Sequence, residues 1–158
     1  LGVNMEKGKI NMTPHIPPSW REFFVKIDTP LYKYDIKGFL HWGFNFYNSQ
    51  VSMYNINPYL TTSADGAFPS GDGFIVYPGK ETAYPSIRGE ITYEAIQDIR
   101  ICEALETLIG REKVVAMIDE AAGRDLRFDD YPSSNAFLEG LREKMIAAIE
   151  ERLILFTH

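Results

Sequence analysis

The chain has 158 residues, of which 45% are hydrophobic and 13% aromatic, which is enough for one domain with a hydrophobic core and too few for two. Its net charge of −6 and pI near 5.1 argue against a nucleic-acid-binding protein, because phosphate neutralisation needs a basic surface and the 16 Lys and Arg residues are scattered among 22 acids. No apolar run approaches the length of a membrane span, so we expect a single unit over 1–158 that binds a neutral or weakly charged ligand.

Cysteine and histidine are too scarce for the usual metal sites, and we expect neither a metal nor a cofactor. The single cysteine, Cys102, lies at a core-facing position of a predicted helix and can form no disulfide within the chain. His15 and His158 lie near the chain ends, which argues against a three-histidine site. The sequence starts at Leu1 without a signal pattern, which hints at a fragment of a longer protein. The compartment is therefore unknown, with the cytoplasm slightly favoured.

The N-terminal residues predict little regular structure before the first strand. Several prolines and few regularly spaced apolar residues predict an irregular arm over 1–19. Apolar spacing from Ser19 onwards predicts a short amphipathic helix with this serine as its N-cap, although Pro30 interrupts a simple continuation. A turn over 35–38 then leads into the strand that organises the chain.

A buried strand is predicted over 38–47, with the sequence Gly-Phe-Leu-His-Trp-Gly-Phe-Asn-Phe-Tyr. Read with a period of two, one face is wholly apolar and consists of Leu40, Trp42, Phe44 and Phe46. The opposite face becomes polar towards its end and consists of Phe39, His41, Gly43, Asn45 and Tyr47. The pattern favours an α/β sheet that has helices on the apolar side and a ligand pocket near the polar side.

A long irregular connection separates this strand from a second one. Residues 48–71 show no helical period, and loops of this length in compact domains are usually functional. The second predicted strand, 72–77, is short and apolar and stops at Pro78. Because a parallel crossover needs about a dozen residues or more, the two strands could form a parallel pair.

Three helices are predicted after the strands, over 86–109, 111–122 and 134–153. Ser86 is the expected N-cap of the first helix and Gly110 ends it, while Gly123 ends the second. Ser133 or Ser134 is the expected N-cap of the third helix. Since two strands alone do not make a stable sheet, we expect the sheet to be completed by the N-terminal segment, another copy of the chain or residues outside this sequence.

Four motifs follow one another along the chain. They are Tyr-Lys-Tyr-Asp-Ile-Lys-Gly-Phe-Leu-His-Trp-Gly-Phe-Asn-Phe-Tyr over 32–47, Asn-Pro at 57–58, Pro-Ser-Gly-Asp-Gly-Phe-Ile-Val-Tyr-Pro-Gly over 69–79 and Ser-Ile-Arg-Gly-Glu over 86–90. In this order they resemble the domain of unknown function 4091, the C-terminal part of proteins related to glycoside hydrolase family 123. The resemblance runs from about Tyr32 to at least Asp98. It implies the last two strands and closing helix of a (β/α)₈ TIM-type barrel, so that this chain would be the C-terminal fragment of a larger enzyme.

The resemblance also implies a chemistry and its limits in this chain. Family members are similar to retaining β-N-acetylgalactosaminidases, which are thought to use the substrate's 2-acetamido group as nucleophile, assisted by an adjacent Asp-Glu pair. The adjacent acids of this chain are Asp119-Glu120, Asp129-Asp130 and Glu150-Glu151. None follows a predicted strand, and solvated charge is the better interpretation of all three. We therefore expect the catalytic pair to be absent from this chain, which by itself should be inactive.

In a barrel of this type the pocket lies at the C-terminal ends of the strands and in the loops that follow them. We expect seven side chains there to contact a substrate: His41, Trp42, Asn45, Tyr47, Asp72, Tyr77 and Arg88. His41 could bind a sugar hydroxyl or be a satisfied core histidine, and Trp42 fits the core better than a stacking platform. Asn45 and Tyr47 are the strongest candidates because they lie near the end of the polar face.

Other positions allow both a structural and a functional interpretation. A structural bridge between Asp72 and Arg88 is favoured over ligand binding, because an arginine in a first helical turn needs a carboxylate partner such as Asp72 or Glu90. Aromatic residues of the long loop could stack on sugars or pack the loop: Tyr54, Tyr59 and Phe68.

The function predicted first is the C-terminal portion of a glycoside hydrolase-like protein that lines a carbohydrate subsite. Its expected partners are a carbohydrate and the remainder of its own barrel or another copy of the chain, and neither nucleic acid nor a membrane is expected. The alternatives are a non-catalytic carbohydrate-binding domain and a structural, self-associating domain.

Overall fold

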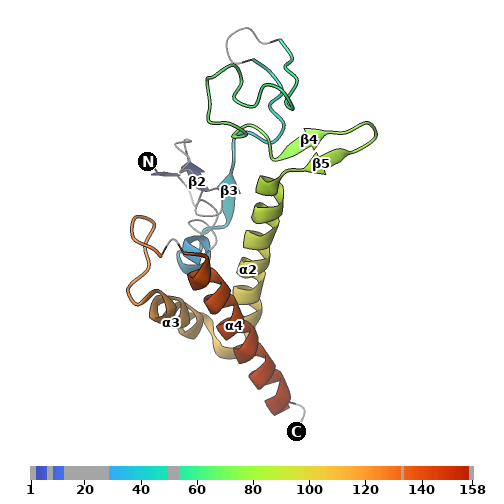
Figure 1. The fold of residues 1–158 in the computed structure, drawn as a ribbon. Coiled ribbons are helices and arrows are strands. Elements are labelled where there is room, and N and C mark those ends of the chain that lie inside the picture. Colours follow the sequence, from blue (N-terminus) through green and yellow to red (C-terminus); the bar gives the residue numbers. More distant parts are fainter. Residues whose placement is uncertain (1–2, 7–8, 13–28, 50–53, 133, 157–158) are drawn as a thin grey trace. The chain divides into compact units, whose positions relative to one another are not determined.

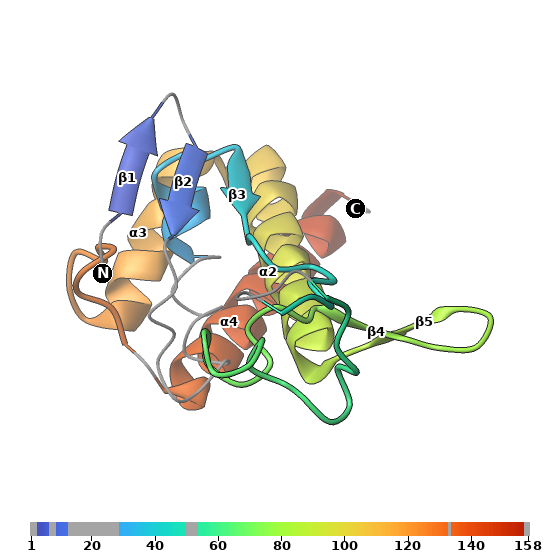
Figure 2. The same cartoon turned by 90° about the horizontal axis from the view of Figure 1, so that it is seen from above.

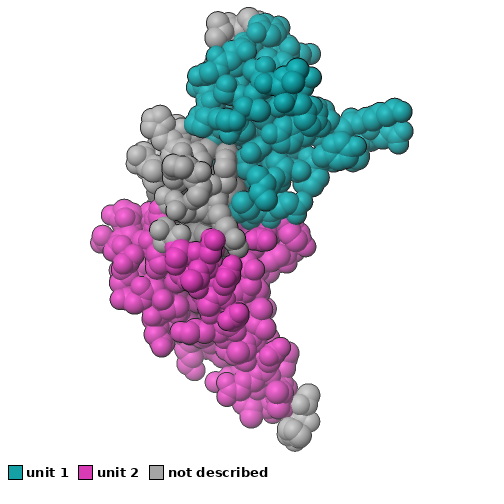
Figure 3. Space-filling view, viewed as in Figure 1, with its two compact units in different colours: residues 1–20, 36–92 teal, residues 21–35, 93–158 magenta. Residues whose placement is uncertain are grey.

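The computed structural model describes residues 3–6, 9–12, 29–49, 54–132 and 134–156. The chain forms two compact units, shown in different colours in Figure 3. Unit 1 comprises 1–20 with 36–92, and unit 2 comprises 21–35 with 93–158. The fold mixes helices and strands, as the sequence predicted, while the single domain and the barrel remain predictions.

Unit 1 contains a three-stranded sheet within which β1, β2 and β3 lie side by side (Figure 2). β1 (Val3–Glu6) pairs antiparallel with β2 (Lys9–Met12), and β2 pairs parallel with β3 (Gly38–Leu40). The predicted irregular arm is therefore corrected for 3–6 and 9–12, where pairing of β2 with β1 and with β3 gives an order that the local sequence pattern does not show. The remainder of the predicted arm lies outside the described residues. The predicted helix from Ser19 lies outside the described residues.

The predicted strand over 38–47 is wrong beyond Leu40, where regular strand structure ends. Leu40 and Phe44 are exposed, so the expected apolar face is not a buried one. The physical reason is a close approach of two backbones: a Cβ at Gly43 would lie 2.6 Å from the Cα of Gly73. A regular pleated strand does not bring two main chains this close, and glycine permits it.

The two segments that were predicted as parallel strands meet in an antiparallel sense. Asn45 and Phe74 form an isolated antiparallel bridge. On either side of it, Phe46 N donates to Gly73 O at 3.0 Å and Ile75 N donates to Phe44 O at 2.8 Å. The expectation of a parallel pair is thus corrected, since the intervening chain turns back instead of crossing over.

The second strand begins later than predicted, as β4 (Val76–Pro78), and pairs antiparallel with β5 (Ala83–Pro85) in a hairpin visible in Figure 1. Residues 71–75 are turned instead, because Asp72 N donates to Pro69 O at 3.0 Å and Phe74 N to Gly71 O at 3.1 Å. These local bonds occupy donors that a strand would use for a neighbour. The hairpin places Tyr77 opposite Tyr84.

The three predicted helices are confirmed as α2 (Ile87–Ile109), α3 (Arg111–Ala122) and α4 (Asn135–Phe156). Their ends follow from caps. Ser86 Oγ accepts the amide hydrogen of Gly89 at 3.2 Å, and Ser134 Oγ accepts that of Phe137 at 3.3 Å. Gly123, at φ 68°, returns its amide hydrogen to the last turn of α3. None of the described helices is both long and apolar enough to cross a membrane.

Unit 2 has a hydrophobic core between these helices. Its fully buried side chains are Leu105, Val114, Ile118 and Leu126. Cys102 is buried beside Met145, as predicted, and its Sγ lies 3.5 Å from the Met145 sulfur. Burial of each large side chain contributes roughly 1.5–3 kcal/mol, so this cluster stabilises unit 2 without help from a disulfide.

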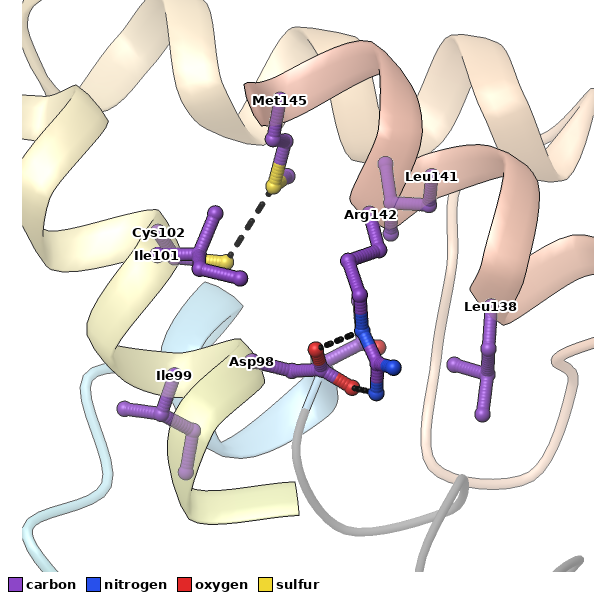
Figure 4. Close-up of a pocket in the computed structure, with 9 residues that line it drawn as sticks. Asp98, Ile99, Ile101, Cys102, Leu138, Leu141, Arg142 and Met145 are labelled. Atoms are coloured by element: carbon purple, nitrogen blue, oxygen red, sulfur yellow. Dashed lines mark hydrogen bonds and ion pairs between the residues drawn. The ribbon is translucent and has the colours of Figure 1, made fainter. Parts of the chain in front are cut away.

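A small depression of unit 2 lies between α2 and α4 (Figure 4). Arg142 binds Asp98 at its edge through two hydrogen bonds of 2.6 and 2.8 Å. The cavity volume of about 20 Å³ holds about one water molecule. It is therefore too small for a sugar ring.

Candidate functional site

The residues predicted to contact a substrate come together in unit 1 from three segments, 41–47, 71–77 and 86–88. Asp72 is the centre of this arrangement. His41 Nε2 donates to its main-chain carbonyl at 2.9 Å, and Trp42 Nε1 donates to its side-chain Oδ2, also at 2.9 Å. His41 and Trp42, which are adjacent in sequence, thus both form hydrogen bonds to Asp72, about thirty residues further along the chain.

Glycines on both sides allow Asp72 to be buried. Gly71 adopts φ +80°, and a Cβ there would lie 2.5 Å from Nη1 of Arg88. Gly73 lies against Gly43 on the other side. The Gly-Asp-Gly segment therefore fits between the guanidinium group of Arg88 and the backbone at Gly43. A side chain at Gly71 would displace Arg88 or the backbone around it.

The carboxyl group of Asp72 is completely buried, with 0% exposure. Its Oδ1 has no hydrogen-bond partner among the described residues. Burial raises the pKa of Asp72 above its ordinary value, and this effect outweighs the Trp42 hydrogen bond and the charges of His41 and Arg88, which lower the pKa. The group therefore holds a proton to higher pH than an exposed aspartate does.

Arg88 lies in the first turn of α2 and is buried. Its Nε donates to the carbonyl of Phe74 at 2.7 Å, and its Nη2 donates to the hydroxyl of Tyr77 at 3.1 Å. The guanidinium carbon also lies 5.8 Å from the centre of the Tyr77 ring. Arg88 thus holds the segment before β4, and its charge favours the ionised form of Asp72, while the predicted bridge between the two remains a prediction.

An aromatic cluster borders these residues and contains Tyr47, Tyr59, Phe74 and Tyr77. Tyr59 stacks on Tyr77 with ring centres 5.2 Å apart and planes at 28°. Tyr59 donates to Pro78 O at 2.7 Å, and Tyr47 donates to Val76 O at the same distance. Burial, and then the hydroxyls of Tyr59 and Tyr77, raise the pKa of Tyr47. The hydrogen bonds of the three tyrosine hydroxyls therefore fix the orientation of these rings.

Two side chains of the site are open to solvent. Tyr59 is 56% exposed although its hydroxyl is held, so one side of its ring is accessible. Asn45 is exposed while its backbone bridges to Phe74, and no described residue hydrogen-bonds its amide group. These are the groups of the site that reach solvent with unused binding capacity.

Trp42 belongs to a second aromatic group, which it forms with Phe46 and Phe68. Its ring centre lies 4.5 Å from that of Phe68 and 5.4 Å from that of Phe46. The side chain is half-buried, so neither of the predicted alternatives, core or stacking platform, describes it alone. It packs on two phenyl rings while part of its surface reaches solvent.

The adjacent acid pairs considered as catalytic candidates, at 119–120, 129–130 and 150–151, lie in unit 2. The predicted contact residues lie in unit 1. Asp119 accepts the amide hydrogen of Leu126 at 2.8 Å, which holds a turn. Asp130 pairs with Arg124, and Asp129 with Arg127. No group of three potential metal ligands occurs in the part of the chain that is described.

Sequence reasoning missed two features of the site. The Tyr59–Tyr77 stack joins the long loop to β4, a pairing that no local pattern reveals. The role of Gly71 and Gly73 was also missed, although two glycines around a single acid are a signal for close backbone approach.

Comparison of the sequence with models of known protein families shows a match to a glycoside hydrolase family. The family model described as glycoside hydrolase 123, catalytic domain, matches residues 25–105. This range includes all the residues predicted to contact a substrate, and it ends within α2. No curated protein shows significant similarity to the chain.

Proposed function

The chain belongs to the glycoside hydrolase 123 catalytic-domain family, and from this membership we propose that it provides a carbohydrate-binding surface of a glycosidase-like protein. The surface comprises the exposed face of Tyr59, the amide of Asn45 and the neighbouring candidates. Its expected ligand is a sugar. We also propose that, within this family, the chain corresponds to the domain of unknown function 4091.

The stack of Tyr59 on Tyr77 is the observation that carries the proposal. Sugar rings present flat patches of C–H bonds that pack on aromatic faces, with hydroxyl groups that need directional hydrogen bonds. Tyr59 offers an exposed face whose orientation is fixed twice, by the stack and by its bond to Pro78 O. An aromatic ring that is already ordered loses little entropy when a ligand binds.

Hydrolysis needs more than this surface supplies. A glycosidase mechanism uses two carboxyl groups, or one together with the substrate's own amide, placed on either side of the scissile bond. Of the seven predicted contact residues only Asp72 carries a carboxyl group, and it is buried. We propose that the catalytic acids come from the remainder of a (β/α)₈ barrel and that this chain alone is inactive.

A structural or self-associating role is the second candidate. Exposed apolar side chains in unit 1 favour it, since surfaces of this kind mark contacts with other protein: Leu40, Leu60 and Ile87. The remainder of the barrel or another copy of the chain would cover them.

An activity assay separates these proposals. The chain is fused to its natural upstream region, and aryl 2-acetamido-glycosides of several sugars are tested with the fusion and with the isolated chain. We expect hydrolysis by the fusion alone. Hydrolysis by neither protein, for any sugar, would count against an enzyme and leave the binding and structural roles.

A matched pair of variants identifies the surface within that assay. In the fusion, Tyr59→Ala should raise KM severalfold, up to about tenfold, since loss of an aromatic contact costs roughly 0.5–1.5 kcal/mol of binding. Tyr93→Ala, which removes an exposed tyrosine of α2, should leave KM unchanged. Equal effects of the two variants would place the surface elsewhere.

A further inference from the structure

The hydrogen bonding of Asp72 is incomplete although the residue has no solvent contact. Oδ2 accepts from Trp42, whereas Oδ1 has no partner among the described residues. A buried carboxyl group with an unpaired oxygen costs free energy, and an apolar side chain of similar volume would avoid that cost. Stability alone therefore does not explain an acid at this position.

The backbone holds this carboxyl group in one place. The Asp72 carbonyl accepts the ring hydrogen of His41, and Asp72 N donates to Pro69 O at 3.0 Å. Gly71 and Gly73 are in close contact with Arg88 and Gly43. Main-chain bonds and tight contacts on both sides therefore fix the point from which the side chain extends, and the bond from Trp42 holds its Oδ2.

Trp42 is the side chain that the carboxyl group constrains. Phe46 and Phe68 contact its ring but set no preferred direction for the indole N–H, since apolar packing is not directional. The bond to Oδ2 at 2.9 Å supplies that direction. With the N–H edge fixed by this bond, the exposed part of the half-buried indole is presented to solvent in one orientation.

We propose that Asp72 is a positioning residue, which orients the Trp42 indole so that its accessible part forms a second aromatic wall of the carbohydrate-binding surface. The wall rests on the proposed function, whereas the orientation of the indole rests on the Asp72–Trp42 bond. An amide oxygen at this position would also accept the indole hydrogen, while a methyl group would not.

The indole hydrogen of Trp42 reports on this bond directly. Trp20→Phe leaves Trp42 as the single indole, because the chain has 2 tryptophans. In this background Asp72→Ala should speed exchange of the indole hydrogen with water about tenfold or more, as expected for loss of a hydrogen bond to a buried acceptor. Asp72→Asn should retain slow exchange. Asp65→Asn, which changes an exposed acid bound by Tyr54, is the matched control and should have no effect.

Sugar affinity tests the wall. Titration with the sugar that binds best should show about tenfold weaker binding for Asp72→Ala and binding within about threefold of the unmodified chain for Asp72→Asn. Should Asp72→Ala fail to fold, Trp42→Phe replaces it, because it keeps an aromatic ring but removes the N–H. Trp42→Phe should weaken binding, and adding Asp72→Asn should weaken it no further.

Each outcome decides the matter. Unchanged indole exchange in Asp72→Ala, or a further loss of affinity in the double variant, overturns the positioning role. Faster exchange with unchanged sugar affinity overturns the wall. If no sugar binds the unmodified chain, the proposed function fails together with the wall, and the indole exchange still decides whether Asp72 orients Trp42.

Discussion

Arg88 donates its Nε hydrogen to the main-chain carbonyl of Phe74 at 2.7 Å, which joins the first turn of α2 to the segment that precedes β4. The same guanidinium group donates to the Tyr77 hydroxyl and lies against Gly71. One buried cation thus holds the aromatic cluster and the turn that carries Asp72. Five predictions about stability follow, three from this arrangement and two from the Lys33 ion pairs of unit 2.

Arg88→Lys should destabilise the chain by about 1–3 kcal/mol. Lysine keeps the charge but lacks the planar fork that reaches Phe74 O and the Tyr77 hydroxyl together, so at least one buried acceptor loses its donor. Urea denaturation measures the free energy of unfolding. Arg100→Lys, at an exposed position of the same helix, is the control and should change it little. Equal unfolding free energies for Arg88→Lys and Arg100→Lys would show that the two hydrogen bonds of the Arg88 guanidinium group do not stabilise the chain.

Gly71→Ala should be more destabilising than Gly66→Ala. Both glycines have positive φ, +80° and +85°, so both alanines cost about 1 kcal/mol of backbone strain. At Gly71 the added methyl group would also lie 2.5 Å from Arg88 Nη1, whereas nothing lies within 4 Å at Gly66. The difference between the two unfolding free energies isolates the contact. A difference near zero would mean that Arg88 moves aside freely.

Asp72 should make the chain less stable as the pH rises. Its folded-state pKa is raised above 3.8, so between the unfolded and the folded pKa the folded state binds more protons than the unfolded state. Stability from this group is therefore complete below pH 3.8 and falls as the pH rises through the folded pKa. As the pH rises from 3.8 through the folded pKa of Asp72, the unmodified chain should therefore lose stability relative to Asp72→Asn. The difference between their unfolding free energies measures this loss. A constant difference would show that burial does not perturb the group.

Asp125 should show the opposite pH dependence. A hydrogen bond from Lys33, and then the charge of Lys33, lower the pKa of Asp125 below 3.8. Its contribution is present above the unfolded pKa and is lost as the pH falls through the folded pKa. The stability difference between the unmodified chain and Asp125→Asn should thus shrink on acidification. A difference that grows at low pH would contradict the assigned interaction.

Lys33→Met should destabilise unit 2 by about 1–3 kcal/mol, because Lys33 is bonded to both Asp119 and Asp125 and its side chain is only 8% exposed. Lys113→Met removes an exposed lysine of α3 and is the control. Thermal unfolding followed by circular dichroism compares the two. The same melting temperature for both variants would mean that the ion pairs of Lys33 with Asp119 and Asp125 contribute no net stability.

The helices could be predicted almost to the residue because the chain marks their ends locally. Ser86, Gly110 and Gly123 are capping residues whose effect depends on the adjacent turn alone. The strands could not be predicted in this way. Whether 41–47 continues as a strand depends on the approach of Gly43 to Gly73, which are thirty residues apart, and no period-two pattern contains that information.

The proximity of several candidate residues is now visible, whereas their role in binding remains a prediction. Hydrogen bonds join His41 and Trp42 to Asp72, and Arg88 to Tyr77. The charge of Arg88 also acts on the carboxyl group of Asp72. The antiparallel return of the chain that brings them together is a tertiary feature. The sequence showed that polar and aromatic groups gather near the strand ends, but not that Asp72 would be buried with one oxygen unpaired.

Titration of the isotopically labelled chain with 2-acetamido sugars, followed by NMR, tests the central claim most directly. The account predicts saturable shifts at Tyr59, Asn45 and the Trp42 indole, and their loss in Tyr59→Ala but not in Tyr93→Ala. The absence of shifts with every sugar, or identical shifts in both variants, would contradict a carbohydrate-binding surface at this place.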